Sequence, residues 1–144
     1  MKYPKGIKAY KNTAVGTADQ KDLILICYDE ALRSLQVGKE CYLRKEFEEK
    51  ARHFVRAHDF ISELLCSLNM QAGGEIARNL SAIYKFCLQH IVQGDVSGNM
   101  RAIDDIIKVL SELRSAWAQL DMRSQVESRS EEVTGEAREF SVGA

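Results

Sequence analysis

Histidine is the side chain that most often binds transition metals and transfers protons near neutral pH, so the three histidines of the chain are the first candidates for chemistry. They are His53, His58 and His90, and the residues three positions before them are Lys50, Val55 and Cys87. A di-metal site in a helical bundle needs Glu-x-x-His on two helices, so that both ligands project from one face into the core. The sequence has no such motif. Its cysteines form no Cys-x-x-Cys pair and are widely separated, at Cys27, Cys41, Cys66 and Cys87. We therefore expect no metal site and no cofactor.

His53 and Arg56 are the residues that favour a second chemistry, phosphoryl transfer. Histidine phosphotransfer domains are helical bundles with an exposed histidine and a basic residue three positions later, which steadies the phosphoryl charge. The small residues expected after that pair are only half present, in Ala57. We interpret His53 as a solvated side chain and keep phosphotransfer as the alternative.

Two other features favour structural roles over catalytic ones. His58 interrupts an apolar stripe, where we expect a hydrogen-bonded core histidine. Gly73-Gly74 precedes a predicted helix, but the sequence has neither Gly-Lys-Ser/Thr nor Gly-x-Gly-x-x-Gly, so we interpret the pair as a turn. No nucleophile, base and orienting residue can be assigned together, and the sequence predicts that the protein is not an enzyme.

The elements that must position these residues are helices. Pro4 is the only proline, and apolar residues recur at spacings of three and four. We predict helices at residues 19–43, 46–68, 74–92 and 99–120, with turns at 69–74 and 94–98. Short connections join antiparallel neighbours, so the expected fold is all-α, an antiparallel up-down four-helix bundle. Its expected core includes Tyr28, Phe47, Ile76, Tyr84 and Ile107.

Composition sets the class of the protein. The chain has 144 residues and a net charge of -1, which suits one globular domain and gives no electrostatic reason to expect nucleic acid or a membrane surface as partner. The longest apolar run, Leu23 to Tyr28, is far too short to span a bilayer, and the N-terminus has no secretory signal pattern. We expect a cytoplasmic location with reduced thiols.

The two ends differ from the predicted bundle domain, residues 19–120. Residues 1–18 carry Ile7, Tyr10 and Val15 and could form a short N-terminal strap. Residues 121–144 hold six acids against three arginines and few large apolar residues. Such a segment buries too little to offset the entropy of ordering it, so we expect a flexible acidic C-terminal tail.

Several large apolar residues fall outside the stripes that a simple bundle needs. On the predicted helices they are Leu25, Ile26, Phe60, Leu64 and Phe86. Taken singly, such residues are ordinary exposed side chains, or lie under one of the two ends of the chain. Taken together with Ile7, Tyr10 and Val15, they favour an apolar groove in which an amphipathic partner segment binds.

Three stretches of this sequence together resemble a known family. The first is Tyr10 to Val15 with Thr17-Ala18-Asp19, followed by Leu23 to Ala31, which ends in Tyr28-Asp29-Glu30-Ala31. The second and most specific is Ser67-Leu68-Asn69, then Gly73-Gly74, then Glu75-Ile76-Ala77-Arg78-Asn79-Leu80. The third is Leu110-Ser111-Glu112-Leu113-Arg114-Ser115-Ala116-Trp117. Over residues 7–120 the chain resembles the flagellar secretion chaperone family, FliS. It departs from the family at Asp19-Gln20, where Ser-Pro is usual, and beyond Leu120.

The resemblance implies a cytoplasmic chaperone for flagellin before export through the flagellar type III apparatus. Family members bind the disordered C-terminal segment of flagellin, which folds into helices around the bundle, and this prevents premature polymerisation. The resemblance also implies, less directly, binding to the flagellar export gate protein. Tyr10 matches the tyrosine of an N-terminal segment that covers part of the substrate groove in the family. An exposed groove would leave the free protein a monomer or a weak homo-oligomer.

Overall fold

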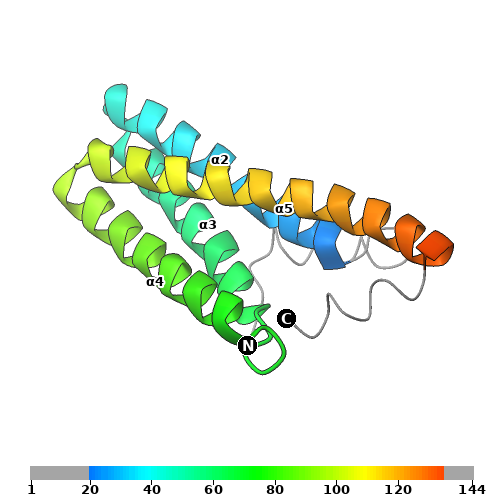
Figure 1. Cartoon of the computed structure of the whole chain (residues 1–144). Coiled ribbons are helices and arrows are strands. Elements are labelled where there is room, and N and C mark those ends of the chain that lie inside the picture. Colours follow the sequence, from blue (N-terminus) through cyan, green and yellow to red (C-terminus); the bar gives the residue numbers. More distant parts are fainter. Residues whose placement is uncertain (1–19, 135–144) are drawn as a thin grey trace.

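The structure is a computed structural model that describes the backbone of residues 20–134 and the side chains of residues 20–120. This part of the chain forms α2 (Gln20–Leu43), α3 (Phe47–Cys66), α4 (Gly74–Ser97) and α5 (Met100–Thr134). Each helix packs on the next, and α5 returns to pack on α2. Consecutive helices reverse direction (Figure 1). The expected all-α fold of four packed helices is confirmed.

The core runs along the axis between the helices. Its largest fully buried side chains include Tyr28, Leu35, Phe54, Tyr84 and Ile103. Helices α2 and α3 approach closely at Gly38, where a Cβ atom would lie 2.4 Å from Cε1 of Phe54. Glycine therefore lets the Phe54 ring pack directly on the α2 backbone.

Two helices end later than the sequence predicted. The predicted turn at 94–98 is mostly helical, because α4 continues to Ser97 and ends at Gly98, whose φ is 69°. Gly94 lies inside α4, and a Cβ atom there would be 3.0 Å from Cδ1 of Ile103, so the small residue serves packing against α5. The predicted end of the last helix at Leu120 is also wrong, since α5 continues to Thr134. Residues 1–19 and 135–144 lie outside the described residues, and the expected strap and flexible tail stay predictions.

The expected core needs three corrections. Phe47 is 52% exposed and Ile76 is 72% exposed, although both lie on apolar stripes. Both stand in the first turn of a helix, at an end of the bundle, where a stripe has fewer neighbours to cover it than at mid-height. On α5, Ile106 is fully buried and Ile107 only partly, because α5 contacts both α2 and α4.

Ion pairs connect neighbouring helices. The Lys50 ammonium, on α3, lies 2.7 Å from Oδ1 of Asp95 and donates a 3.0 Å hydrogen bond to the Asp95 carbonyl oxygen on α4. The Arg114 guanidinium of α5 donates to both carboxylate oxygens of Asp29 on α2, at 2.9 and 3.3 Å. Within the described residues, no helix has an apolar stretch of the length that crossing a bilayer requires.

Candidate functional site

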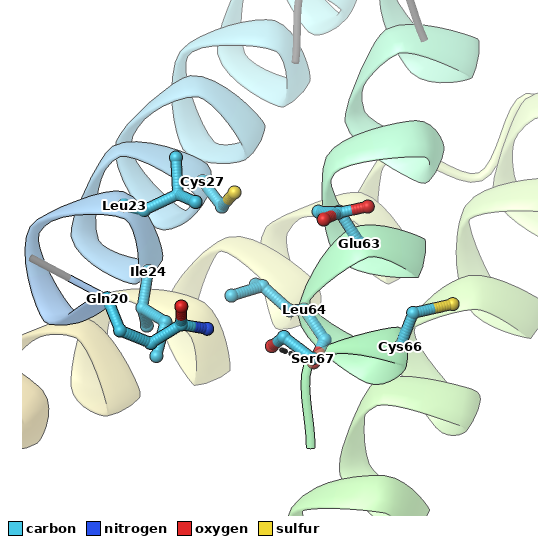
Figure 2. Close-up of a pocket in the computed structure, with 8 residues that line it drawn as sticks. All are labelled: Gln20, Leu23, Ile24, Cys27, Glu63, Leu64, Cys66 and Ser67. Atoms are coloured by element: carbon cyan, nitrogen blue, oxygen red, sulfur yellow. Dashed lines mark hydrogen bonds between the residues drawn. The ribbon is translucent and has the colours of Figure 1, made fainter. Parts of the chain in front are cut away.

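Two adjoining pockets lie at one end of the bundle, formed by the start of α2, the end of α3, the start of α4 and the middle of α5. The first has a volume of about 270 Å³ and lies between α2 and α3. Figure 2 shows Ile24 on α2 and Leu64 on α3 on either side of this pocket, while the sulfur of Cys66 points away from α2. The other lining residues of this pocket are Gln20, Leu23, Cys27, Glu63 and Ser67.

The second pocket, of about 290 Å³, continues from the first across to α4 and α5. The two pockets share Ile24, Leu64 and Ser67, so we treat them as one site and call it the end groove. The second pocket is additionally lined by Leu68, Asn69, Ala72, Gly73, Ile76, Ala77, Leu80, Tyr84 and Trp117. Most of these side chains are apolar, and none carries a charge. The second pocket is therefore suited to apolar side chains.

A buried pair of tyrosines lies beneath the second pocket. The hydroxyl oxygens of Tyr28 and Tyr84 are 2.5 Å apart, and both residues are almost fully buried. Burial is the main cause that raises the pKa of both phenols, while the indole of Trp117 beside them acts in the opposite direction. Burial also raises the pKa of the nearby Cys87 thiol to about 11. All these groups are therefore neutral near pH 7, and the tyrosines are held as hydrogen-bonding groups and not as bases.

The loop between α3 and α4 forms one rim of the end groove. The side-chain oxygen of Asn69 accepts a 3.0 Å hydrogen bond from the amide of Ala72, and its carbonyl oxygen accepts a 2.8 Å bond from the amide of Gly73. A Cβ atom at Gly73 would lie 2.5 Å from the Cβ of Ala77, and Gly74 has a φ of 54°. The glycine pair is thus required by this tight turn, as the sequence predicted.

Among the predicted partner-binding residues that the structure describes, one lies in the end groove. That residue is Leu64, which lines both pockets. Leu25 and Ile26 are partly buried and line neither pocket. Phe86 is exposed on α4, as expected, but stacks on the ring of His90 with the two ring centroids 3.9 Å apart.

The expected exposure of Phe60 and Leu64 is wrong, because both are 2% exposed and belong to the core. The physical reason is that α3 packs against both α2 and α4, so its buried face is wider than a single stripe. Their part in partner binding is not tested by this burial. Ile7, Tyr10 and Val15 lie outside the described residues.

The residues considered for other chemistry have structural surroundings. The Arg56 guanidinium lies 3.3 Å from Oε2 of Glu30 and 5.1 Å above the Phe60 ring, so it ties α3 to α2. His58 is partly buried, and its Nδ1 lies 3.5 Å from the hydroxyl of Ser62. The Arg56 contacts give this residue a structural role between α3 and α2.

Sequence reasoning missed most of the end groove. Ile24, Ile76, Tyr84 and Trp117 fall on apolar stripes, and that pattern predicts core positions instead of a groove. One sequence feature indicates that Ile76 is exposed. It stands in the first turn of α4, just after the loop that follows α3. An apolar stripe that continues to the very end of a bundle has fewer neighbours to cover it there.

Comparison with known proteins places the chain in a family. The family model described as flagellar protein FliS matches residues 3–124. The chain belongs to the FliS family of flagellar proteins. It is 29% identical to the flagellar secretion chaperone FliS of Vibrio cholerae over 118 residues, which cover 79% of this chain and 87% of the relative. It is 28% identical to the flagellar secretion chaperone FliS of Salmonella typhimurium over 124 residues, covering 83% and 92%.

A third relative, the flagellar secretion chaperone FliS of Bacillus subtilis, is 23% identical over 111 residues, covering 77% of this chain and 82% of the relative. Membership of a chaperone family, and not of an enzyme family, agrees with the absence of an assignable catalytic set in the sequence. The segments that carry the resemblance also supply much of the end groove, including Ile24, Asn69, Ile76 and Trp117. The end groove is therefore the candidate site for the chaperone function.

Proposed function

We propose that this protein is a cytoplasmic export chaperone that binds the disordered C-terminal segment of flagellin. Binding prevents premature polymerisation and keeps flagellin competent for flagellar type III secretion. The observation that carries the proposal is the end groove, which continues across all four helices in the segments shared with the family and whose second pocket is uncharged and mainly apolar. Membership of the FliS family supports it.

The extent of the end groove suits successive side chains of a polypeptide. Its two pockets, of about 270 and 290 Å³, adjoin through Ile24, Leu64 and Ser67, and together they reach from α2 to α5. Ile76, at the rim, is 72% exposed and extends the apolar surface beyond the pockets. An elongated segment could therefore place successive apolar side chains along the groove, which is how an amphipathic helix binds.

The energetics require several buried anchors. A disordered segment that folds on binding loses about 2–5 kcal/mol of the interaction energy to ordering. Each large apolar side chain that is fully buried contributes about 1.5–3 kcal/mol. Two or three anchors in the end groove would therefore be needed to offset ordering and leave a useful affinity.

The test replaces Ile76 by Asp and measures binding of a purified flagellin C-terminal fragment by isothermal titration calorimetry. We expect the affinity to fall more than tenfold, about 1.4 kcal/mol. The fold should survive, because Ile76 is exposed and an acid in the first turn suits the helix dipole. The matched control is Val96→Asp, since Val96 is 85% exposed at the opposite end of the same helix. Normal binding by the Ile76 variant, or equal loss in both variants, would refute the end groove as the binding site.

We further propose that residues 1–18 compete with flagellin for the end groove through Ile7 and Tyr10. The supporting observation is connectivity, since Gln20 lines the first pocket and the segment that precedes it is attached at the edge of the groove. A competing segment lowers the affinity by the fraction of time that the groove is covered. Removing residues 1–18 should therefore strengthen flagellin binding, and weaker binding would show that these residues contact the substrate instead.

A further inference from the structure

The first pocket of the end groove carries a charge, unlike the second. Its lining includes Glu63 and contains no lysine, arginine or histidine. Glu63 is 8% exposed, and Figure 2 shows it on the α3 wall of the pocket, with Cys27 on the α2 wall. A carboxylate with so little water around it needs cations or hydrogen-bond donors to be stable. The first pocket is therefore suited to a cationic side chain.

Lysine is a cation that fits this pocket well. The Glu63 carboxylate has two oxygens with about four acceptor sites, so a contact within the bundle leaves room for a donor that enters the pocket. A lysine ammonium stands at the end of a long flexible stem, and such stems pack along apolar surface. Leu23, Ile24 and Leu64 provide that surface in a pocket of about 270 Å³.

The N-terminal strap, residues 1–18, has the complementary charge. It contains neither aspartate nor glutamate, and its lysines are Lys2, Lys5, Lys8 and Lys11. The strap is also attached at the edge of this pocket, because Gln20 lines the pocket. An extended chain spans about 3.3–3.6 Å per residue, so even Lys11 has a reach of roughly 30 Å from Gln20. A tethered segment meets its site at an effective concentration of about millimolar, which favours the strap over a free partner of the same charge.

We propose that a lysine of the N-terminal strap forms an ion pair with Glu63 in the first pocket and thereby holds the strap across the end groove. Lys8 and Lys11 are the two candidates, because they flank Tyr10, through which the strap is proposed to compete with flagellin. The inference rests on that proposed competition and adds a charged anchor to it. A bound segment must then displace the ion pair as well as the apolar contacts of the strap.

Chymotrypsin cleavage after Tyr10 measures how often the strap is released, because a protease cuts the open form in proportion to its population. Glu63→Gln removes the charge and nearly keeps the shape of the side chain. We expect it to speed this cleavage about three- to tenfold, the range of a partly buried ion pair. The matched control is Glu48→Gln, since Glu48 is exposed at the other end of the same helix. An unchanged rate in Glu63→Gln, or an equal increase in both folded full-length variants, would overturn the ion pair.

A double-mutant cycle identifies the lysine. Lys8→Gln and Lys11→Gln are each measured in the unchanged chain and beside Glu63→Gln. Substitution of the true partner should speed cleavage by a clearly smaller factor beside Glu63→Gln than in the unchanged chain, because the pair is already broken there. Additive effects for both lysines would show that neither pairs with Glu63 and would overturn the proposal.

Two measurements test other occupants of the first pocket. Protection of Tyr10 should be independent of protein concentration, and its loss on dilution would assign the pocket to the strap of a second copy. In calorimetric titration with the flagellin C-terminal fragment, Glu63→Gln should bind more tightly, because a released strap competes less. Weaker binding would assign Glu63 to a cation of flagellin and overturn this inference while leaving the proposed function intact. Absence of binding by the unchanged chain would overturn the proposed function, whereas the cleavage test of the ion pair uses no flagellin.

Discussion

Gly38 offers the sharpest test of how the core of this bundle is packed. In an exposed helix interior, replacing glycine by alanine stabilises a protein by about 1 kcal/mol, because alanine has the higher helix propensity. At Gly38 the new Cβ atom would lie 2.4 Å from Cε1 and 2.6 Å from Cδ1 of Phe54. Carbon atoms in contact prefer a separation of about 3.5–4.0 Å. The two helices, or the ring, must therefore move apart by about 1 Å.

The Phe54 ring cannot easily make that movement. It is 1% exposed and belongs to the same core cluster as Leu35 and Ile91. Overpacking a core in this way costs about 1–3 kcal/mol, and we expect the upper part of that range because the clash involves a ring enclosed by the core. After subtracting the propensity gain, Gly38→Ala should lower the free energy of unfolding by about 1–2 kcal/mol.

The assay is urea unfolding followed by far-ultraviolet circular dichroism, carried out as a double-mutant cycle with Phe54→Leu. Leucine lacks the ring atoms that approach Gly38, so Gly38→Ala should cost markedly less in the Phe54→Leu background. The reasoning would be refuted if Gly38→Ala stabilised the unchanged chain, or if its effect were the same in both backgrounds.

Local geometry and titration support four further predictions. Gly98→Ala should lower the free energy of unfolding by about 1–2 kcal/mol, because Gly98 has a φ of 69° and a Cβ atom there would lie 2.9 Å from the Tyr42 hydroxyl. Gly74→Ala should cost less in the same urea assay, because its φ of 54° is unfavourable but no atom lies within 4 Å, and an equal cost would contradict this. A chain ending at Asp121 should lose helical circular dichroism, since α5 continues to Thr134, yet keep its melting temperature within a few degrees, and a larger fall would show that the removed segment packs on the bundle. Stability should decline as the pH rises from about 9 through 11, because burial raises the pKa of Cys87 from 9.0 to about 11 and the unfolded chain then releases the thiol proton more readily. The pKa shifts of Tyr28 and Tyr84 act in the same direction, and a urea midpoint that stays constant up to pH 11 would disprove the prediction.

Helix number, order and most boundaries could be predicted from the sequence because they depend on local interactions. The spacing of apolar residues identified each helix, and Asn69 with Gly73 and Gly74 marked the turn before α4. The boundaries that were wrong depended on neighbours. Gly94 suggested a turn, yet it lies inside α4, where a Cβ atom would be only 3.0 Å from Cδ1 of Ile103 on α5. The sequence alone does not distinguish a glycine that allows close helix packing from a glycine that allows a turn.

The family was also identifiable from the sequence, because three motifs in order along one chain are specific even at the identities found here. The candidate site could not be identified from the sequence. Phe60 and Leu64 lie off the apolar stripe of their helix and were expected to be exposed, whereas Ile76 lies on its stripe and was expected to be buried. The structure shows the opposite in both cases.

The physical reason is that periodicity gives the direction of a side chain around its own helix axis, whereas exposure depends on what stands opposite at the same height. Phe60 points between two neighbouring helices and is covered by them. Ile76 points inward at a level where the bundle ends, so nothing described covers it. The sequence by itself determined that four helices form, that a turn precedes α4 and which family the chain belongs to. Only the tertiary structure decided that a groove forms at one end of the bundle, where the start of α2, the end of α3 and the start of α4 meet Trp117 of α5, with Tyr84 beneath. The residues that line this groove are far apart in the sequence, so no local pattern predicts it.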